Sequence, residues 1–212
     1  MNDAPQYSEA WVKIRLGRCT ASRVADAMAK TKTGWGASRE NYAWELAWER
    51  LTGEPEEGTY QSAAMLQGIE REPEARRLYS FKYDADVQEC GFVPHPQIVM
   101  AGASPDGLIG DDGLLEIKCP QPKAHGNALR FGTIDGRYIQ QMQWQMACTG
   151  RRWVDFVSYS RRPPESMRLW CKRIPRDDAM IRELETGVRA FLAEVEEILN
   201  DLRKRYPIAE AA

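Results

Sequence analysis

The spacing of hydrophobic residues along the chain changes between two periods. Apolar residues recur every three or four positions in six segments, which predicts helices, and they alternate or form short runs in five others, which predicts strands. The predicted helices cover residues 8–14, 20–30, 39–51, about 59–83, 137–149 and about 177–205. The predicted strands cover residues 87–93, 98–104, 114–119, 153–160 and 167–174.

Local signals mark several ends of these helices. Ser8, Thr20 and Ser38 are the expected N-caps of the first three helices, and Gly53 is expected to end the third. Pro73 must kink the fourth helix or open a new turn within it. The order of helices, three strands, a helix, two strands and a helix predicts an α/β fold: a central mixed β-sheet flanked by helices, with a long C-terminal helix.

The length of the chain suits one domain. We expect a single domain over residues 1–212, with a helical N-terminal part (about 8–83), a sheet-containing core (about 86–175) and a C-terminal helix (about 177–205). No window approaches the roughly 18 apolar residues of a membrane span, and the first residues lack the pattern of a signal peptide. We therefore expect a cytoplasmic protein without a membrane partner, in a bacterial or phage-infected cell.

The cysteine and histidine content restricts the possible metal chemistry. The five cysteines are widely spaced and form no CxxC pair, so reduced thiols are expected rather than disulfides or a zinc or iron–sulfur clamp. The chain has only two histidines, His95 and His125. Any bound metal should therefore have oxygen ligands, which suits Mg²⁺ or Mn²⁺.

Charge is segregated along the chain although the formal net charge is only -2. Eight basic residues accompany two acidic ones between Arg151 and Arg176, whereas nine acidic residues accompany four basic ones between Glu54 and Glu89. The basic segment is a candidate phosphate-binding track, although solvated charged faces are commoner.

The segment ASPDGLIGDDGLLEIKC holds the candidate chemistry. Glu116 and Lys118 are two residues apart on a predicted strand, so their side chains share one face. Asp106 lies in a PDG turn, and a DDG hairpin can return the chain so that Asp106 lies beside Glu116. Two carboxylates that converge favour a divalent cation, and a lysine beside them can orient or deprotonate a water or stabilise developing charge. The spacing alone favours an edge strand whose polar face is solvated, because an Asp separated by nine residues from a Glu-x-Lys occurs by chance in many proteins.

The flanking residues add a family resemblance. SPDG followed by LLEIKCP resembles the PD-(D/E)xK nuclease superfamily, and more narrowly the lambda-exonuclease or YqaJ-type phage recombination exonucleases. Three further blocks resemble the same family in the same order: IRLGRCTAS, GIEREPEARRLY and YIQQMQWQM. The resemblance covers most of residues 11–160 and implies a restriction-endonuclease-like core.

The resemblance implies roles for individual residues. Asp106 and Glu116 match the metal-binding carboxylates, with the carbonyl of Ile117 as a further ligand, and Lys118 matches the catalytic lysine. Glu72 matches a helical glutamate that assists the metal or its water, with Glu70 as the competing choice. The residues matching those that bind the terminal 5′-phosphate are Arg15, Ser22, Ser104 and Gln141. His125 and Tyr138 are expected to be structural.

The resemblance also implies a function. It predicts a Mg²⁺-dependent exonuclease, with Mn²⁺ able to substitute, that digests one strand of linear double-stranded DNA from its 5′ end and leaves a 3′ overhang. Members of the family form homotrimeric rings and deliver the overhang to a single-strand annealing recombinase protein. The alternatives are another nuclease of the superfamily, either an endonuclease or a Cas4-like enzyme with a four-cysteine cluster, and a non-catalytic module that binds DNA ends.

Overall fold

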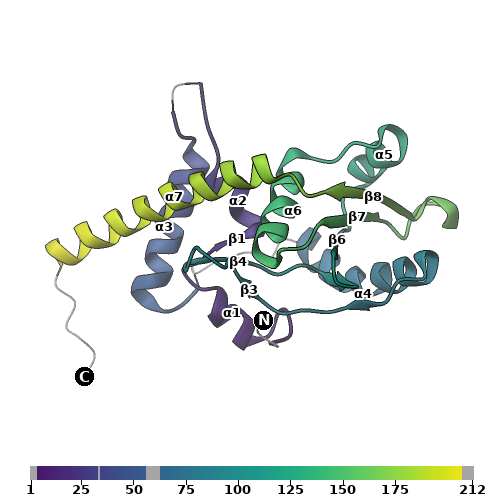
Figure 1. Ribbon diagram of the computed structural model, residues 1–212, viewed down its shortest axis with the longest axis horizontal. Helices are drawn as coiled ribbons and strands as arrows, with labels where there is room; N and C mark the ends of the chain where they lie inside the picture. Colours follow the sequence, from purple (N-terminus) through teal and green to yellow (C-terminus); the bar gives the residue numbers. More distant parts are fainter. Residues whose placement is uncertain (1–3, 33, 56–62, 207–212) are drawn as a thin grey trace.

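The computed structural model describes residues 4–32, 34–55 and 63–206. It confirms the predicted fold class, because helices flank mixed β-sheets and a long helix, α7 (Asp178–Arg205), ends the described chain (Figure 1). Within these ranges no helix is long and apolar enough to cross a membrane.

The larger sheet has five strands in the order β2-β5-β6-β7-β8. Four of its strands are β2 (Val87–Gln88), β5 (Gly107–Ile109), β6 (Gly113–Lys118) and β7 (Trp153–Tyr159), and the fifth is β8 (Leu169–Pro175). The pair β6–β7 is parallel and the other pairs are antiparallel. The central strand β6 therefore has backbone partners on both sides, which fixes the direction of its side chains.

The connection from β6 to β7 passes through α5 (Pro122–Phe131) and α6 (Gly136–Thr149). Met142 and Met146 of α6 pack against Leu114 of β6, whereas Leu115 and Ile117 pack with residues of α4 (Ala63–Tyr83). Alternation along β6 therefore directs Glu116, like Leu114, toward α6.

A smaller sheet lies beside the N-terminal helices. Its order is β1-β4-β3, from β1 (Cys19–Thr20), β4 (Ala101–Ala103) and β3 (Val93–Pro94). The N-terminal helix α1 (Glu9–Arg15) leads into β1, and α7 runs along α3 (Ala37–Thr52) (Figure 1). A buried apolar cluster joins this sheet to α3, α6 and α7, with Tyr42, Trp144 and Phe191 among its largest members.

Some predicted elements differ from those observed. The strand predicted over 87–93 is divided, so that β2 belongs to the larger sheet and β3 to the smaller one. The helix predicted over 20–30 is shortened to a 3-10 turn, η1 (Ala21–Arg23), and one turn of α-helix, α2 (Val24–Ala27). Thr20 occupies the N-cap position of η1, but its side chain forms no capping hydrogen bond, and its backbone is paired with Gly102 in the parallel β1–β4 ladder.

The helix ends show mixed outcomes. Ser8 is confirmed as an N-cap, since its hydroxyl accepts a hydrogen bond from the Trp11 amide at 3.2 Å. The prediction of Ser38 as an N-cap is wrong, because α3 begins two residues earlier than predicted, at Ala37, and its N-cap is Gly36. Helix α4 continues through Pro73, and the predicted first residues of that helix, 59–62, lie outside the described chain. The sequence prediction also missed α5 and a second 3-10 turn, η2 (Glu165–Met167).

Candidate active site

Asp106, Glu116 and Lys118 line one cavity of about 440 Å³ at the end of the larger sheet. Asp106 lies between β4 and β5, and the β5–β6 hairpin brings it beside β6, as the DDG turn suggests. Its Oδ2 accepts a hydrogen bond at 2.6 Å from the backbone amide of Ile117, the residue between the other two. The predicted convergence of the three side chains is therefore present.

Glu116 is fully buried and accepts hydrogen bonds from three side chains. Lys118 Nζ lies 2.6 Å from Oε1, and Gln141 Nε2 donates to the same oxygen at 2.7 Å. Gln145 Nε2 donates to Oε2 at 2.5 Å. These donors account for the burial of a carboxylate, which without partners would be strongly unfavourable in the interior.

The pKa values of Asp106 and Lys118 are both raised at the cavity, for different reasons. Burial, followed by repulsion from the Glu116 and Glu72 carboxylates, raises the pKa of Asp106 well above its ordinary range. Burial disfavours the Lys118 ammonium, but attraction to Glu116 and Asp106 outweighs that effect and raises the pKa of Lys118. Lys118 is therefore a cation at neutral pH, whereas the ionised form of Asp106 is disfavoured unless further positive charge is supplied.

Glu72, and not Glu70, lines this cavity. Glu72 is held by Arg76, whose Nη2 lies 2.5 Å from Oε1, and by Tyr7, whose hydroxyl donates to Oε2 at 3.3 Å. Glu70 points elsewhere and pairs with Arg161 at 3.1 Å on the surface. Helix α4 continues through Pro73 without a break, and Glu72 lies at the same cavity as Asp106 and Glu116.

The four residues expected to bind a terminal phosphate line the same cavity: Arg15, Ser22, Ser104 and Gln141. Arg15 Nη1 lies 3.5 Å from Ser104 Oγ, which also accepts a hydrogen bond from Trp11 Nε1 at 3.0 Å. The Arg15 guanidinium stacks on Trp11, 3.9 Å from its ring centroid. Among the described residues, no carboxylate forms an ion pair with Arg15, so this half-buried cation is available to an anion.

Ser22 and Gln141 are placed differently from Arg15. Ser22 is exposed at the edge of the cavity, and its Oγ lies 3.4 Å from Thr20 Oγ1. The short η1–α2 segment offers no helix N-terminus long enough to bind an anion, so the side chains alone make this site. Gln141 uses one amide hydrogen for Glu116, and its second amide hydrogen is the one available to a phosphate.

Three further residues contribute to the site without having been assigned to it from sequence. Tyr7 and Trp11 line the cavity from the N-terminal segment, and Gln145 contacts Glu116 from α6. Tyr7 has a positive φ of 69°, an uncommon backbone conformation for a non-glycine residue. Only Gln145 has a sequence signal, namely its position one helical turn beyond Gln141.

The two residues expected to be structural have different surroundings. His125 is buried, with Nδ1 2.8 Å from Ser158 Oγ and Nε2 2.8 Å from the Met167 carbonyl oxygen, which agrees with a structural role. Tyr138 stacks on Phe156 but also lines the cavity, with its ring 5.1 Å from Lys118 Nζ.

Several basic side chains from the segment Arg151 to Arg176 form ion pairs or hydrogen bonds with other residues of the protein. Arg161 pairs with Glu70 and Glu74, Arg173 pairs with Asp155, and Arg176 pairs with Asp178. Arg151 donates to three backbone carbonyls near the β5–β6 turn. These contacts weaken the interpretation of the segment as an open phosphate track.

The donor set at the cavity fits Mg²⁺. No group of three or more His, Cys, Asp or Glu side chains is arranged as a metal site in the part of the chain that the structure describes. Mg²⁺, however, keeps several waters and is commonly bound by one or two carboxylates together with substrate phosphates. Asp106 and Glu116 supply such carboxylates, and their mutual repulsion is the condition that a divalent cation relieves.

Comparisons with known proteins agree on the type of fold. Residues 10–152 match the YqaJ-like viral recombinase domain. The crystal structure of an alkaline exonuclease from Laribacter hongkongensis is similar over 93% of this chain and 97% of that chain, with 51% identity and a TM-score of 0.87. The same values apply to that exonuclease in complex with dAMP.

A more distant structure has the same fold. It is a phage-related exonuclease from Haemophilus somnus 129PT, with 15% identity, a TM-score of 0.66, and coverage of 87% of this chain and 96% of that chain. The chain matches no curated protein.

Proposed function

The chain belongs to the YqaJ-like viral recombinase domain family, and from this premise we propose that it is a Mg²⁺-dependent exonuclease acting in recombination. We propose that it digests one strand of linear double-stranded DNA from the 5′ end and leaves a 3′ single-stranded overhang. The name of the similar exonuclease supports nuclease activity. The direction and the metal are inferred from the site and from the family resemblance.

One observation carries the proposal: Asp106, Glu116 and Lys118 share a cavity with Arg15 and Ser104. The first three residues are suited to metal-assisted phosphodiester hydrolysis, and the other two are suited to binding a phosphate. A single cavity that contains both sets can hold the terminal phosphate of a strand while the adjacent phosphodiester is hydrolysed.

Each residue of the site has a separate role in the proposed hydrolysis. When bound, Mg²⁺ polarises a phosphoryl oxygen and lowers the pKa of water. Asp106 and Glu116 hold the cation, and Glu72, held by Tyr7 and Arg76, orients water at the cavity. Lys118 is charged, so it acts as a hydrogen-bond donor that orients the nucleophile or stabilises the developing negative charge.

The same proposal includes the partners that the family resemblance implies. These are double-stranded DNA ends, two further copies of this chain in a homotrimeric ring, and a single-strand annealing recombinase that receives the overhang. Light scattering of the purified protein tests the ring, and a monomer at all concentrations would contradict it.

The decisive experiment uses linear duplex DNA labelled at either the 5′ or the 3′ end. With Mg²⁺, the 5′ label should be released first, and EDTA should stop the release. Mn²⁺ should restore it. Release of the 3′ label first would overturn the direction, and degradation that persists in EDTA would overturn the metal dependence.

Closed circular duplex DNA is the control for the main alternatives. An exonuclease must leave it intact, whereas an endonuclease would cut it. DNA binding without any digestion in Mg²⁺ or Mn²⁺ would indicate the non-catalytic end-binding module. The five free cysteines give no support to a Cas4-like enzyme, since among the described residues they are not gathered into a group of three or more ligating side chains.

A further inference from the structure

Gln145 holds the oxygen of Glu116 that Lys118 does not contact. Its Nε2 donates to Glu116 Oε2 at 2.5 Å, and both residues are fully buried. Gln141, one helical turn earlier on α6, donates to the other oxygen, Oε1, at 2.7 Å. The two side-chain amides of α6 therefore hold the carboxylate of Glu116, which belongs to β6.

The carbonyl oxygen of the Gln145 side chain has no hydrogen-bond partner among the described residues. Its Oε1 is buried and accepts no hydrogen bond from the residues that the structure describes. An unpaired buried acceptor costs free energy of folding, and an apolar side chain of similar size would avoid that cost. Packing alone therefore does not explain an amide at this position, whereas the contact of its nitrogen with Glu116 does.

The neutrality of the two amides matters for the cavity. An ammonium such as Lys118 cancels the charge of Glu116, whereas an amide N–H stabilises the ionised carboxylate and leaves its charge intact. The cavity is lined by three carboxyl side chains, Asp106, Glu72 and Glu116, and by the cations Lys118 and Arg15. The two amides therefore hold Glu116 without cancelling the negative charge by which it attracts a cation.

We propose that Gln145 is a positioning residue that sets the affinity of the site for its divalent cation. It does so by holding Glu116 Oε2, so that the carboxylate keeps one orientation toward the cavity. This inference rests on the proposed metal-dependent function. Hydrogen-bond partners of metal ligands orient those ligands, and their loss typically lowers metal affinity about 10–100-fold.

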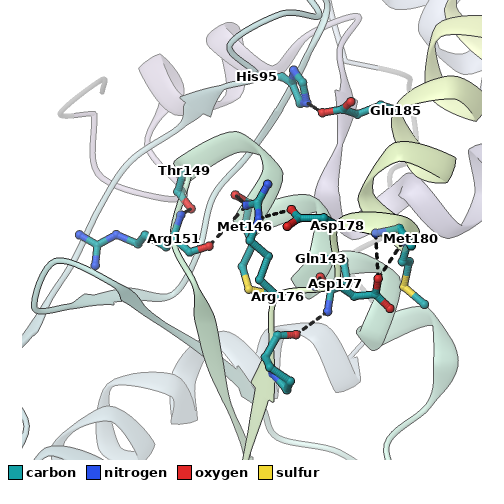
Figure 2. A network of polar contacts seen from close by, with 12 residues as sticks. His95, Gln143, Met146, Thr149, Arg151, Arg176, Asp177, Asp178, Met180 and Glu185 are labelled. Carbon is teal, nitrogen blue, oxygen red and sulfur yellow. Dashed lines mark hydrogen bonds and ion pairs between the residues drawn. The ribbon is translucent and has the colours of Figure 1, made fainter.

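Gln143 provides a matched control on the same helix. It is also buried, but its Nε2 donates to the Pro175 carbonyl oxygen at 2.9 Å and its Oε1 accepts from the Asp177 amide at 2.8 Å. The second contact joins α6 to the start of α7 (Figure 2), and neither contact involves Glu116. Replacing Gln143 removes buried hydrogen bonds without touching the cavity.

The test is a calorimetric titration of Mn²⁺ into the full chain without DNA, for the wild type, Gln145→Met and Gln143→Met. We expect the Kd for Mn²⁺ to rise about tenfold or more in Gln145→Met and to stay near the wild-type value in Gln143→Met. The Mg²⁺ concentration that gives half-maximal digestion should rise in parallel, and saturating Mg²⁺ should restore most of the rate. A purely structural role would lower thermal stability without shifting the metal requirement.

Failure of the inference and failure of the proposed function are distinguishable. Equal Kd values for Mn²⁺ in the wild type and Gln145→Met would overturn the role of Gln145 and leave the nuclease standing. A wild type that neither binds Mn²⁺ nor digests DNA would overturn the function itself. If Gln145→Met does not fold, the same criterion applies to Gln145→Asn, which keeps an amide but is one methylene too short to reach Glu116.

Discussion

Lys118 Nζ lies 2.6 Å from Glu116 Oε1, so the two charged residues that share a face of β6 are in direct contact. Glu116 also receives two amide hydrogen bonds from α6, and it therefore stays buried and partnered even without the lysine. This arrangement separates the chemistry of Lys118 from the stability of the carboxylate.

Lys118→Ala should therefore reduce catalysis much more than folding. We expect the rate of digestion of linear duplex to fall by about 10²–10³-fold, the range that a positioned hydrogen-bond donor to developing negative charge contributes. DNA binding should be largely retained, because Arg15 and Ser104 are untouched. Single-turnover digestion and a binding assay in Ca²⁺ measure the two effects, and Asp106→Ala should give the same pattern. Full activity in both variants would end the proposed mechanism.

Glu70 and Glu72 of α4 form a matched pair. Glu72→Gln should lower the digestion rate about 10–100-fold, because Glu72 lines the cavity and is oriented by Tyr7 and Arg76. Glu70→Gln should have little effect, since it removes one exposed ion pair with Arg161. Initial rates of both variants at saturating Mg²⁺ make the comparison. The reverse order would show that the family match on α4 is displaced by two residues.

Arg15 should decide whether the end of a strand is recognised by its phosphate. A hydrogen bond to a charged group contributes about 1.5–3 kcal/mol, so Arg15→Ala should reduce the preference for 5′-phosphate over 5′-hydroxyl ends roughly ten- to hundredfold. The measurement is the ratio of digestion rates on the two duplexes. Arg18→Ala is the control, because Arg18 Nη1 donates to the Val99 carbonyl oxygen and Arg18 does not line the cavity. An unchanged ratio in Arg15→Ala would remove the end pocket.

The sequence predicts the catalytic strand well because the relevant signals are local. Alternation places Glu116 and Lys118 on one face of β6, and the DDG turn brings Asp106 back beside them, so neither step requires knowledge of distant residues. The choice between Glu70 and Glu72, in contrast, depends on how α4 packs against β6. The resemblance favours Glu72, and the structure places it at the cavity.

The elements that sequence reasoning missed depend on distant partners. Thr20 has the residue type of an N-cap, but pairing of its backbone with Gly102, far along the chain, turns it into a strand residue. Helix α5 carries Pro122 at its start and Gly132 after its end, which are adequate local signals, but its apolar pattern is short. Gln145 resembles any polar residue on a buried helix until the position of Glu116 is known.

His95 should make the stability of the fold depend on pH. Burial lowers the pKa of His95 below its ordinary value, and the neighbouring Glu185 does not fully compensate. The Gln97 amide donates to Nδ1 at 3.2 Å, so the neutral ring carries its proton on Nε2, which lies 3.2 Å from Glu185 Oε1 on α7 (Figure 2). Protonation of Nδ1 would break the contact with Gln97 and place a charge beside Trp144.

The sign of the effect follows from the lowered pKa. Because the unfolded chain binds a proton near pH 6.5 and the folded chain does not, the stabilisation is complete above that pH. It is lost as the pH falls toward the lower pKa of the folded state, by at most about 1.4 kcal/mol per pH unit. Denaturant unfolding at pH 7.5 and pH 5.0 should show a smaller decrease in His95→Gln than in the wild type, since the glutamine cannot titrate. Parallel decreases in the two proteins would show that His95 is not the group whose protonation weakens the packing of α7 at low pH.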